Sequence, residues 1–338
     1  MKSASKVRNI FLIIGIVAIV VMLFTFEVPY REIWENLQKA GWWFVAVLAI
    51  WIPIYMLNAW AWIVILNDGS HSNVNFWRIL KYTVSGYAIN YVTPIGVLGG
   101  EPYRIMELTP HVGGAKATSS VILYAMMHIY SHFFFWAFSV LLYIALYFSK
   151  IDVMMGLLLL LVSAFCAIAI YFFMKGYRNG LAQKTLRILS RIPGMKKWAT
   201  RISVEKKEEL ERIDSQIAEL HKKRKSTFYL SLFLEFMARV VGCLEIWFIM
   251  MIFTDSVSFF DCILISAFTT LFANLFFFMP LELGAREGGF ALAVGGMQLS
   301  GFYGVFAALI TRVREFIWIF IGIALMKVFN KKPQDAVD

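Results

Sequence analysis

The chain has 338 residues, of which 60% are hydrophobic and 16% are charged. This composition excludes an ordinary soluble domain and predicts an all-α integral membrane protein. The net charge of +10 is concentrated in residues 176–226, which hold fourteen Lys or Arg against six Asp or Glu. The three cysteines stand singly in apolar runs, without the spacing of a metal site or of a disulfide framework.

The first apolar run, Ile10–Phe26, follows three basic residues and lacks a small-residue cleavage site after it. It is therefore predicted to be an uncleaved first span with a cytoplasmic N-terminus. Residues 27–40 are expected on the outer surface. Gly41–Leu66 is predicted as the second span, since about 20 apolar residues cross the hydrocarbon core. Pro53 is expected to kink it, because proline removes a helix hydrogen bond.

A stretch rich in glycine and proline interrupts the next helical segment. Phe76–Val92 is predicted to be a short helix that stops before Pro94, and Glu101–Leu108 to be a second short helix. Non-helical backbone is tolerated at membrane depth only inside protein or beside a wet cavity. Residues 76–109 are therefore interpreted as a re-entrant hairpin.

Two further spans lead into the basic loop. Ala117–Ser149 and Val153–Met174 are predicted as the third and fourth spans, joined by an outer turn. Loop 176–226 is placed in the cytoplasm, because basic loops stay there. Aliphatic residues at 3-4-3 spacing predict an amphipathic helix between Ser203 and Lys223. Anionic lipid headgroups are the expected contact of this loop, and nucleic acid is not, because no base-reading module is present.

The last third of the chain repeats the pattern of span, hairpin and span. The predicted elements are a fifth span at Thr227–Phe253, a half-helix at Phe259–Met279, a break at residues 280–289 with a second arm to Met297, and a last span at Gly301–Val328. Counted from the cytoplasm, the first hairpin enters from inside and the second from outside. We expect six spans and two hairpins, or eight spans if the hairpin arms cross fully. The protein is then multi-pass in the cytoplasmic (inner) membrane, with both termini cytoplasmic.

The two broken regions match in spacing. Each proline follows an asparagine and precedes a glutamate by seven residues, as in Asn90, Pro94 and Glu101, and again in Asn274, Pro280 and Glu287. The match predicts one flippase-like domain over 1–338 built as an inverted repeat, with repeat one at about 41–149 and repeat two at about 227–328. Inverted repeats with broken helices are typical of secondary transporters.

The hairpins are candidates for binding an anionic headgroup. Broken helix ends present N–H groups that attract anions, glycines allow close approach, and arginine binds phosphate through a fork of donors. The predicted substrate-binding residues are Asn90, Pro94, Gly99, Gly100, Glu101, Arg104, Asn274, Pro280, Gly284, Arg286, Glu287 and Arg314. The alternative is tight helix packing through small residues.

Charged residues within the predicted spans are expected to form supporting ion pairs. They are Glu235, Arg239, Glu245, Arg312, Arg314 and Glu315. Charges at membrane depth are expensive and mark functional sites, although structural pairs that fix helix register are the alternative. Glu235 with Arg239, and Arg312 with Glu315, have the spacing to pair on one helix.

Arg314 faces the other side of its helix and is expected to take Glu245 or Glu287. His128 and Arg314 each lie 34 residues after the proline of their repeat, so His128 is the expected repeat mate of Arg314. His128 and His132 are four residues apart, a spacing that can hold a metal. No nearby carboxylate or cysteine completes such a set, so helix packing is favoured and neither a metal nor another cofactor is expected.

The motif Asn90…Thr93-Pro94-Ile-Gly96…Gly99-Gly100-Glu101…Arg104 and the motif Pro280–Gly289 resemble the two signatures of the lysylphosphatidylglycerol synthase transmembrane (flippase-like) family. The late Arg312–Glu315 region also fits. The resemblance extends over roughly residues 10–328. It implies a bacterial or archaeal membrane protein linked to translocation of an aminoacylated phospholipid. Because the chain ends at Asp338 without the synthase domain of fused members, a stand-alone flippase-like domain is expected.

Two positions depart from the family pattern. The second signature usually begins Pro-Gly-Gly, whereas Leu281 and Glu282 follow Pro280 here. The first-repeat span usually has Glu-Arg where this chain has Met127-His128. A weaker or pH-dependent anion contact is expected at His128, since histidine titrates near neutrality.

The preferred hypothesis is an inner-membrane lipid translocase. It would move an anionic or aminoacylated phospholipid, or a polyprenyl-phosphate lipid, between leaflets. The motifs of nucleotide sites, zinc peptidases and serine hydrolases are missing from the sequence, so transport is favoured over catalysis. The alternatives are a membrane-embedded transferase acting on a lipid headgroup, and a non-catalytic partner of a lipid-synthesis enzyme recruited through loop 176–226. No oligomeric state follows from the sequence.

Overall fold

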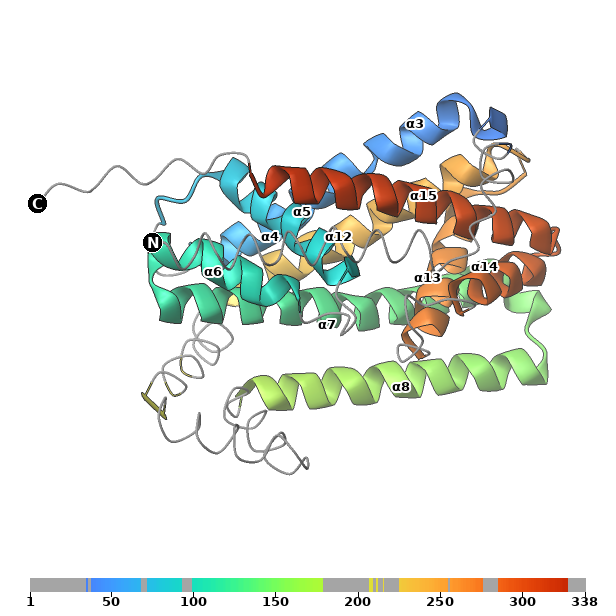
Figure 1. The fold of residues 1–338 in the computed structure, drawn as a ribbon. Helices are drawn as coiled ribbons and strands as arrows, with labels where there is room; N and C mark the ends of the chain where they lie inside the picture. Colours follow the sequence, from blue (N-terminus) through green and yellow to red (C-terminus); the bar gives the residue numbers. More distant parts are fainter. Residues whose placement is uncertain are drawn as a thin grey trace, which may run out of the picture.

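The structure is a computed structural model that describes part of the chain (Figure 1). The described residues are 35, 38–67, 72–92, 99–178, 207–208, 211, 215, 225–254, 256–275 and 285–327. Their main elements are ten α-helices and one short 3-10 helix, and no β-strand occurs among these residues. The predicted all-α fold is confirmed.

The helices follow the sequence expectations closely, except that residues 285–289, predicted to lie in the second break, are helical. They are α3 (Trp42–Ala49), α4 (Trp51–Leu66), α5 (Phe76–Val92), α6 (Gly100–Val112), α7 (Gly114–Tyr147), η2 (Phe148–Lys150), α8 (Val153–Arg178), α12 (Lys225–Met250), α13 (Phe259–Leu275), α14 (Ala285–Gly296) and α15 (Gly301–Leu325). Three stretches within the described residues are long and apolar enough to cross a membrane: Trp42–Leu66, Gly114–Lys150 and Val153–Lys175.

The interruption between α3 and α4 falls at Ile50, three residues before Pro53. Proline has no N–H, and its ring crowds the carbonyl four residues earlier, here that of Ala49. Helical hydrogen bonds are present on both sides of this interruption, from Ile50 N to Ala46 O at 3.0 Å and from Ile54 N to Ile50 O at 3.4 Å. The expected distortion is present just before the proline.

Helix α6 is longer than predicted. It continues past Leu108 to Val112 and includes Pro110 in its last turn. The chain leaves the helix only at Gly113, whose φ of 82° suits glycine. The N–H of Gly113 still donates to Thr109 O at 2.9 Å. A proline this near the helix end removes one hydrogen bond without ending the helix.

Helices α4 and α12 pack against each other at the centre of the helix arrangement. Around them, α5 packs on α4, α6 and α15, while α13 packs on α12, α14 and α7. Figure 1 shows α5 and α6 toward one end of the molecule and α13 and α14 toward the other. One hydrophobic cluster gathers around Trp62 and Tyr124, and a second around Val294 and Phe306. The arms of the two candidate hairpins therefore belong to different parts of the core.

Glycines allow α5 to approach its neighbours closely. A Cβ added to Gly100 would lie 2.1 Å from the Gly86 carbonyl oxygen, where α6 crosses α5. A Cβ added to Gly322 would lie 2.5 Å from Ala88 Cβ, where α15 crosses α5. Ser85 on α5 also donates to Gly322 O at 2.8 Å. Small residues thus allow the close contacts of α5 with α6 and with α15.

Several sequence predictions fall outside the described residues. They concern the first span Ile10–Phe26, the hairpin breaks with Pro94, Pro280 and Gly284, and almost all of loop 176–226.

Candidate functional site

Ten charged side chains lie between the helices and contact one another or nearby polar groups. We call them the charged network: Glu101, Arg104, Glu235, Arg239, Glu245, Arg286, Glu287, Arg312, Arg314 and Glu315. All ten are buried or half-buried. Five guanidinium groups balance five carboxylates, so the formal charge of the network is zero.

Arg104 on α6 is almost fully buried, with 2% of its surface exposed. Its Nη1 donates to Glu101 Oε1 at 3.0 Å, and its Nη2 donates to Thr83 O at 3.3 Å. The guanidinium carbon lies 4.9 Å from the ring centroid of Tyr87 and 5.3 Å from that of Tyr124. Cation–π contacts of this kind are strongest where water is excluded. The group is held on all sides by α5, α6 and α7.

The start of α6 is fixed by Asn90 on α5. The N–H of Gly100 donates to Asn90 Oδ1 at 2.6 Å, and Asn90 Nδ2 donates to Glu101 Oε1 at 3.3 Å. The first helical N–H is thus satisfied within the protein. Gly86 leaves the space that Arg104 fills, since a Cβ there would lie 2.3 Å from Arg104 Nε. The two arms of hairpin one are joined by these contacts.

His128 on α7 pairs with Glu235 on α12. Its Nδ1 lies 2.7 Å from Glu235 Oε2 and 3.0 Å from the Tyr87 hydroxyl, which in turn lies 3.3 Å from the Tyr124 hydroxyl. Glu235 is 0% exposed. Tyr87 and Tyr124 also lie against Arg104. The two tyrosines therefore connect the Arg104–Glu101 pair to the His128–Glu235 pair.

The predicted pair between Glu235 and Arg239 is wrong. Arg239 Nε donates to Ser131 Oγ at 2.7 Å, and its Nη2 donates to His128 O at 2.5 Å. The reason is that α7 packs along α12 and offers both residues partners across the interface. The spacing on one helix permits a pair but does not exclude better partners on the next helix.

Arg314 on α15 makes a two-pronged ion pair with Glu245 on α12. Its Nε donates to Oε1 at 2.7 Å, and its Nη2 donates to Oε2 at 3.0 Å. Trp51 Nε1 donates to the same carboxylate at 3.0 Å, and the guanidinium carbon lies 3.9 Å from the Trp51 ring centroid. Of the two partners predicted for Arg314, Glu245 is confirmed. Paired forks of this type are among the strongest charged hydrogen bonds.

Hairpin two is tied to α15 by crossed ion pairs. Arg286 Nη1 donates to Glu315 Oε1 at 2.5 Å, and Arg312 Nε donates to Glu287 Oε1 at 2.6 Å. The predicted pair between Arg312 and Glu315 is therefore wrong. Helix α14 lies against α15, so Arg286 and Glu287 of α14 pair with the charged residues of α15. Arg312 and Glu315 therefore do not pair with each other along α15. Arg314 Nη1 also lies 3.7 Å from Glu315 Oε1, which joins both sets of pairs.

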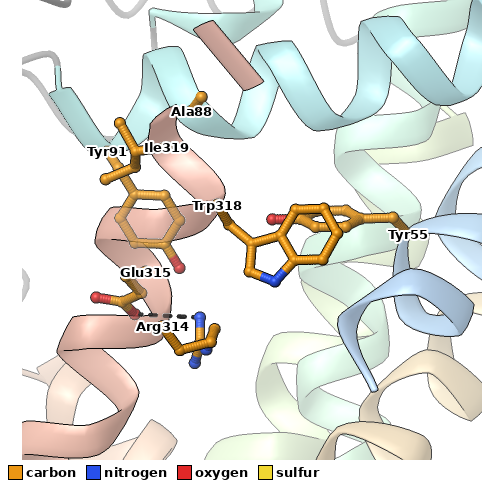
Figure 2. A pocket seen from close by; sticks show the side chains of 7 residues that line it. All are labelled: Tyr55, Ala88, Tyr91, Arg314, Glu315, Trp318 and Ile319. Atoms are coloured by element: carbon orange, nitrogen blue, oxygen red, sulfur yellow. Dashed lines mark ion pairs between the residues drawn. The ribbon is translucent and has the colours of Figure 1, made fainter. Parts of the chain in front are cut away.

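A narrow crevice between α4, α5 and α15 lies beside Arg314 and is closed in this structure, with no room for a water molecule (Figure 2). It is lined by Tyr55, Ala88, Tyr91, Arg314, Glu315, Trp318 and Ile319. Figure 2 shows Arg314 and Glu315 facing this space, with the rings of Tyr91, Trp318 and Tyr55 around it. The Tyr55 ring centroid lies 4.9 Å from that of Trp318 and 5.7 Å from that of Tyr87. Tyr55 thus connects the crevice to the His128 group.

The predicted binding residues divide into two sets. Asn90, Gly100, Glu101 and Arg104 come together at hairpin one, with Gly99 just before α6; Arg286, Glu287 and Arg314 gather around α15. Asn274 does not match Asn90: it is exposed, and its Nδ2 donates to Thr270 O at 2.8 Å within its own helix. The spacing from the asparagine to the proline differs between the two repeats, so Asn90 and Asn274 are not equivalent positions.

Sequence reasoning missed the aromatic residues of the site. They are Trp51, Tyr55, Tyr87, Tyr91, Tyr124 and Trp318. In a chain that is 17% aromatic, a single aromatic residue does not distinguish a binding site from ordinary helix packing. The available signal was spacing, since Tyr87 and Tyr91, like Trp51 and Tyr55, are four residues apart on one helix face.

Within the part of the chain that the structure describes, the two histidines of α7 gather no further metal ligands. Their rings meet edge to face with centroids 5.8 Å apart. Among the described residues, no group of three or more His, Cys, Asp and Glu side chains is placed to hold a metal. His132 packs with its ring centroid 5.3 Å from that of Trp136.

The family model for the lysylphosphatidylglycerol synthase TM region matches residues 11–323. The chain belongs to this family. The match includes every helix that contributes to the charged network. Membership makes the chain a membrane protein related to lipid handling, which agrees with its apolar helices. Comparisons with curated proteins and with solved structures found no match.

Proposed function

We propose that this protein of the lysylphosphatidylglycerol synthase transmembrane family moves a lipid with an anionic headgroup between leaflets. The substrate is an anionic or aminoacylated phospholipid or a polyprenyl-phosphate lipid. The observation that carries the proposal is the charged network itself. Ionisable groups inside a membrane protein are expensive and commonly mark a substrate path. Here they extend from α6 through α7 and α12 to α15 and α14.

Repeated helix contacts support an inverted repeat. The contacts α4–α5, α5–α6 and α6–α7 correspond to α12–α13, α13–α14 and α14–α15. The contact of α7 with α13 corresponds to that of α15 with α5. The hairpin arms lie toward opposite ends of the molecule (Figure 1). On this proposal, residues 41–149 and 227–328 are repeats of opposite orientation, and each hairpin is re-entrant.

The ion pairs give a physical route for exchange. A phosphate, like a carboxylate, offers two oxygens that accept from a guanidinium fork, so it can replace Glu315 at Arg286 or Glu245 at Arg314. The released carboxylate then pairs with a headgroup amine or with another arginine. Because Arg286 and Arg314 each have a carboxylate to return to, the headgroup is not trapped. Rocking of one repeat against the other would open the crevice beside Arg314 to each leaflet in turn.

The proposal also places the protein in its membrane. Both termini and loop 176–226 lie in the cytoplasm, and the membrane is the cytoplasmic one. The +8 charge of this loop favours contact with anionic headgroups of the inner leaflet. A lipid-synthesis enzyme that supplies the substrate is the partner this location suits.

Reconstituted vesicles test the proposal. Fluorescent phosphatidylglycerol in the outer leaflet is bleached with a membrane-impermeant reductant, and protection reports movement to the inner leaflet. We expect faster movement with protein than in empty vesicles, and loss of the gain in Arg314→Gln and Arg104→Gln. Lys150→Gln is the matched control, since Lys150 is exposed and lies outside the charged network. Equal rates with and without protein for anionic lipids would refute translocation.

A further inference from the structure

At one matched position the two repeats carry different basic side chains. His128 and Arg314 each lie 34 residues after the proline of their repeat. Each pairs with a glutamate of α12, His128 with Glu235 and Arg314 with Glu245. Arginine stays charged at every physiological pH, whereas histidine gains or loses its charge near neutrality. One of the two matched pairs is therefore permanent and the other is titratable.

The surroundings of His128 determine where a second proton binds. Glu235 Oε2 lies 2.7 Å from His128 Nδ1, and an ionised Glu235 only accepts, which assigns the proton of a neutral His128 to Nδ1. The second proton must then bind at Nε2, which lies 3.5 Å from the Tyr87 hydroxyl. Tyr87 belongs to α5, the first arm of hairpin one. Protonation of Nε2 thus places a positive charge next to the Tyr87 hydroxyl of that arm.

The charged and titratable side chains that face His128 come from four helices. They are Tyr87 on α5, Arg104 on α6, Tyr124 and His132 on α7, and Glu235 and Arg239 on α12. With His128 neutral, the ten-residue charged network sums to zero. With His128 protonated, it carries one positive charge. Glu235 Oε1 is buried and has no hydrogen-bond partner among the described residues, so this carboxylate can respond to the change.

We propose that His128, held by Glu235 and Tyr87, is a proton-binding site that takes up a proton when the anionic headgroup binds. This inference rests on the proposed lipid translocation and names its coupling ion. A positive network attracts an anion, and a bound anion stabilises protonated His128. By linkage the two effects are equal in free energy. The proton and the lipid therefore cross as a pair, and the sum of charge in the site stays near zero.

The pH dependence of translocation tests the site. The protonated fraction falls about tenfold per pH unit above the titration point of a single group. We expect the wild-type rate to rise as pH falls from 8.5 to 5.5. His128→Arg, with a permanent charge, should be fast and independent of pH. His128→Gln should be slow and independent of pH. His111→Gln, which removes a histidine at the far end of α6, should keep the wild-type profile.

A second measurement does not depend on transport. Short-chain phosphatidylglycerol is added to purified protein in weakly buffered detergent with a pH indicator. We expect uptake of up to one proton per protein by the wild type and His111→Gln, no uptake by His128→Gln, and no uptake on adding phosphatidylcholine. Uptake that persists in His128→Gln, or a pH profile unchanged in both His128 variants, overturns the proton site. Absence of movement for every lipid at every pH refutes translocation instead, and proton uptake then still decides whether His128 loads with an anion.

Discussion

At the residue scale, the pair of Arg314 and Glu245 separates a structural role from a transport role. Removing one partner leaves the other charge buried and unpaired, which destabilises a protein by about 3–5 kcal/mol. Replacing both partners by apolar residues of similar size is often close to neutral. A pair that serves only to hold α15 on α12 should therefore be dispensable as a pair.

We predict that Glu245→Leu alone lowers the thermal stability in detergent strongly. The double variant Arg314→Met with Glu245→Leu should recover most of this stability, yet it should not translocate lipid, because the fork that holds the headgroup is gone. Differential scanning fluorimetry and the vesicle assay provide the two readouts. Normal translocation by the stable double variant would show that the pair is structural.

The aromatic residues around Arg104 make a second residue-scale prediction. The guanidinium lies 4.9 Å from the Tyr87 ring and 5.3 Å from the Tyr124 ring. A buried cation–π contact contributes up to about 2 kcal/mol. Tyr87→Leu should therefore lower stability and slow translocation, while Tyr87→Phe should keep the ring contact and lose only the hydroxyl contacts to His128 and Tyr124. If the Phe and Leu variants behave alike in thermal unfolding, the ring has no such role.

Ion-pair partners mark the limit of sequence reasoning at this scale. Glu235 and Arg239 have suitable spacing, as do Arg312 and Glu315, yet all four take partners on other helices. Spacing along one helix says which side chains can meet. It does not say which facing helix offers a better donor or acceptor. For Arg314 the sequence narrowed the partner to Glu245 or Glu287, and the packing of α15 on α12 selects Glu245.

At the element scale, the close crossing of α5 and α6 depends on glycine. A Cβ on Gly86 would lie 2.3 Å from Arg104 Nε and 2.9 Å from its Cζ. Overpacking of this kind typically costs about 1–3 kcal/mol. We predict that Gly86→Ala lowers the melting temperature and displaces Arg104, with slower translocation. The matched control is Gly114→Ala, where the added Cβ meets nothing within 4 Å. Equal melting temperatures for the two variants would contradict the crossing.

Helix positions could be predicted because apolar length and proline position largely set them. Pro53 predicted the interruption near Ile50. The predicted spans agree within a few residues with α3 and α4 taken together and with α7, α8, α12 and α15. The end of α6 could not be predicted, since Pro110 is tolerated once it falls in a last turn that Gly113 completes. Likewise, the matched asparagines suggested equal roles, but Asn274 faces outward.

At the scale of the whole molecule, the proposed inverted repeat fixes which end faces which side. Asn73, before α5, should face the cytoplasm, and Ser256, before α13, should face the outside. Single cysteines at these exposed positions, with the three native cysteines replaced by alanine, should be labelled by an impermeant maleimide from opposite sides of the membrane. Lys150→Cys serves as the control for the outer side. Labelling of both test positions from one side would rule out inversion.

The central claim is that an anionic headgroup binds within the charged network between the two repeats. The most direct measurement is an experimental density map of the protein with bound phosphatidylglycerol in a lipid nanodisc. The account predicts phosphate density in the crevice between α5 and α15, within hydrogen-bond distance of Arg314 or Arg286. Lipid density confined to the outer apolar surface, with the Arg314–Glu245 and Arg286–Glu315 pairs intact and nothing between them, would contradict it.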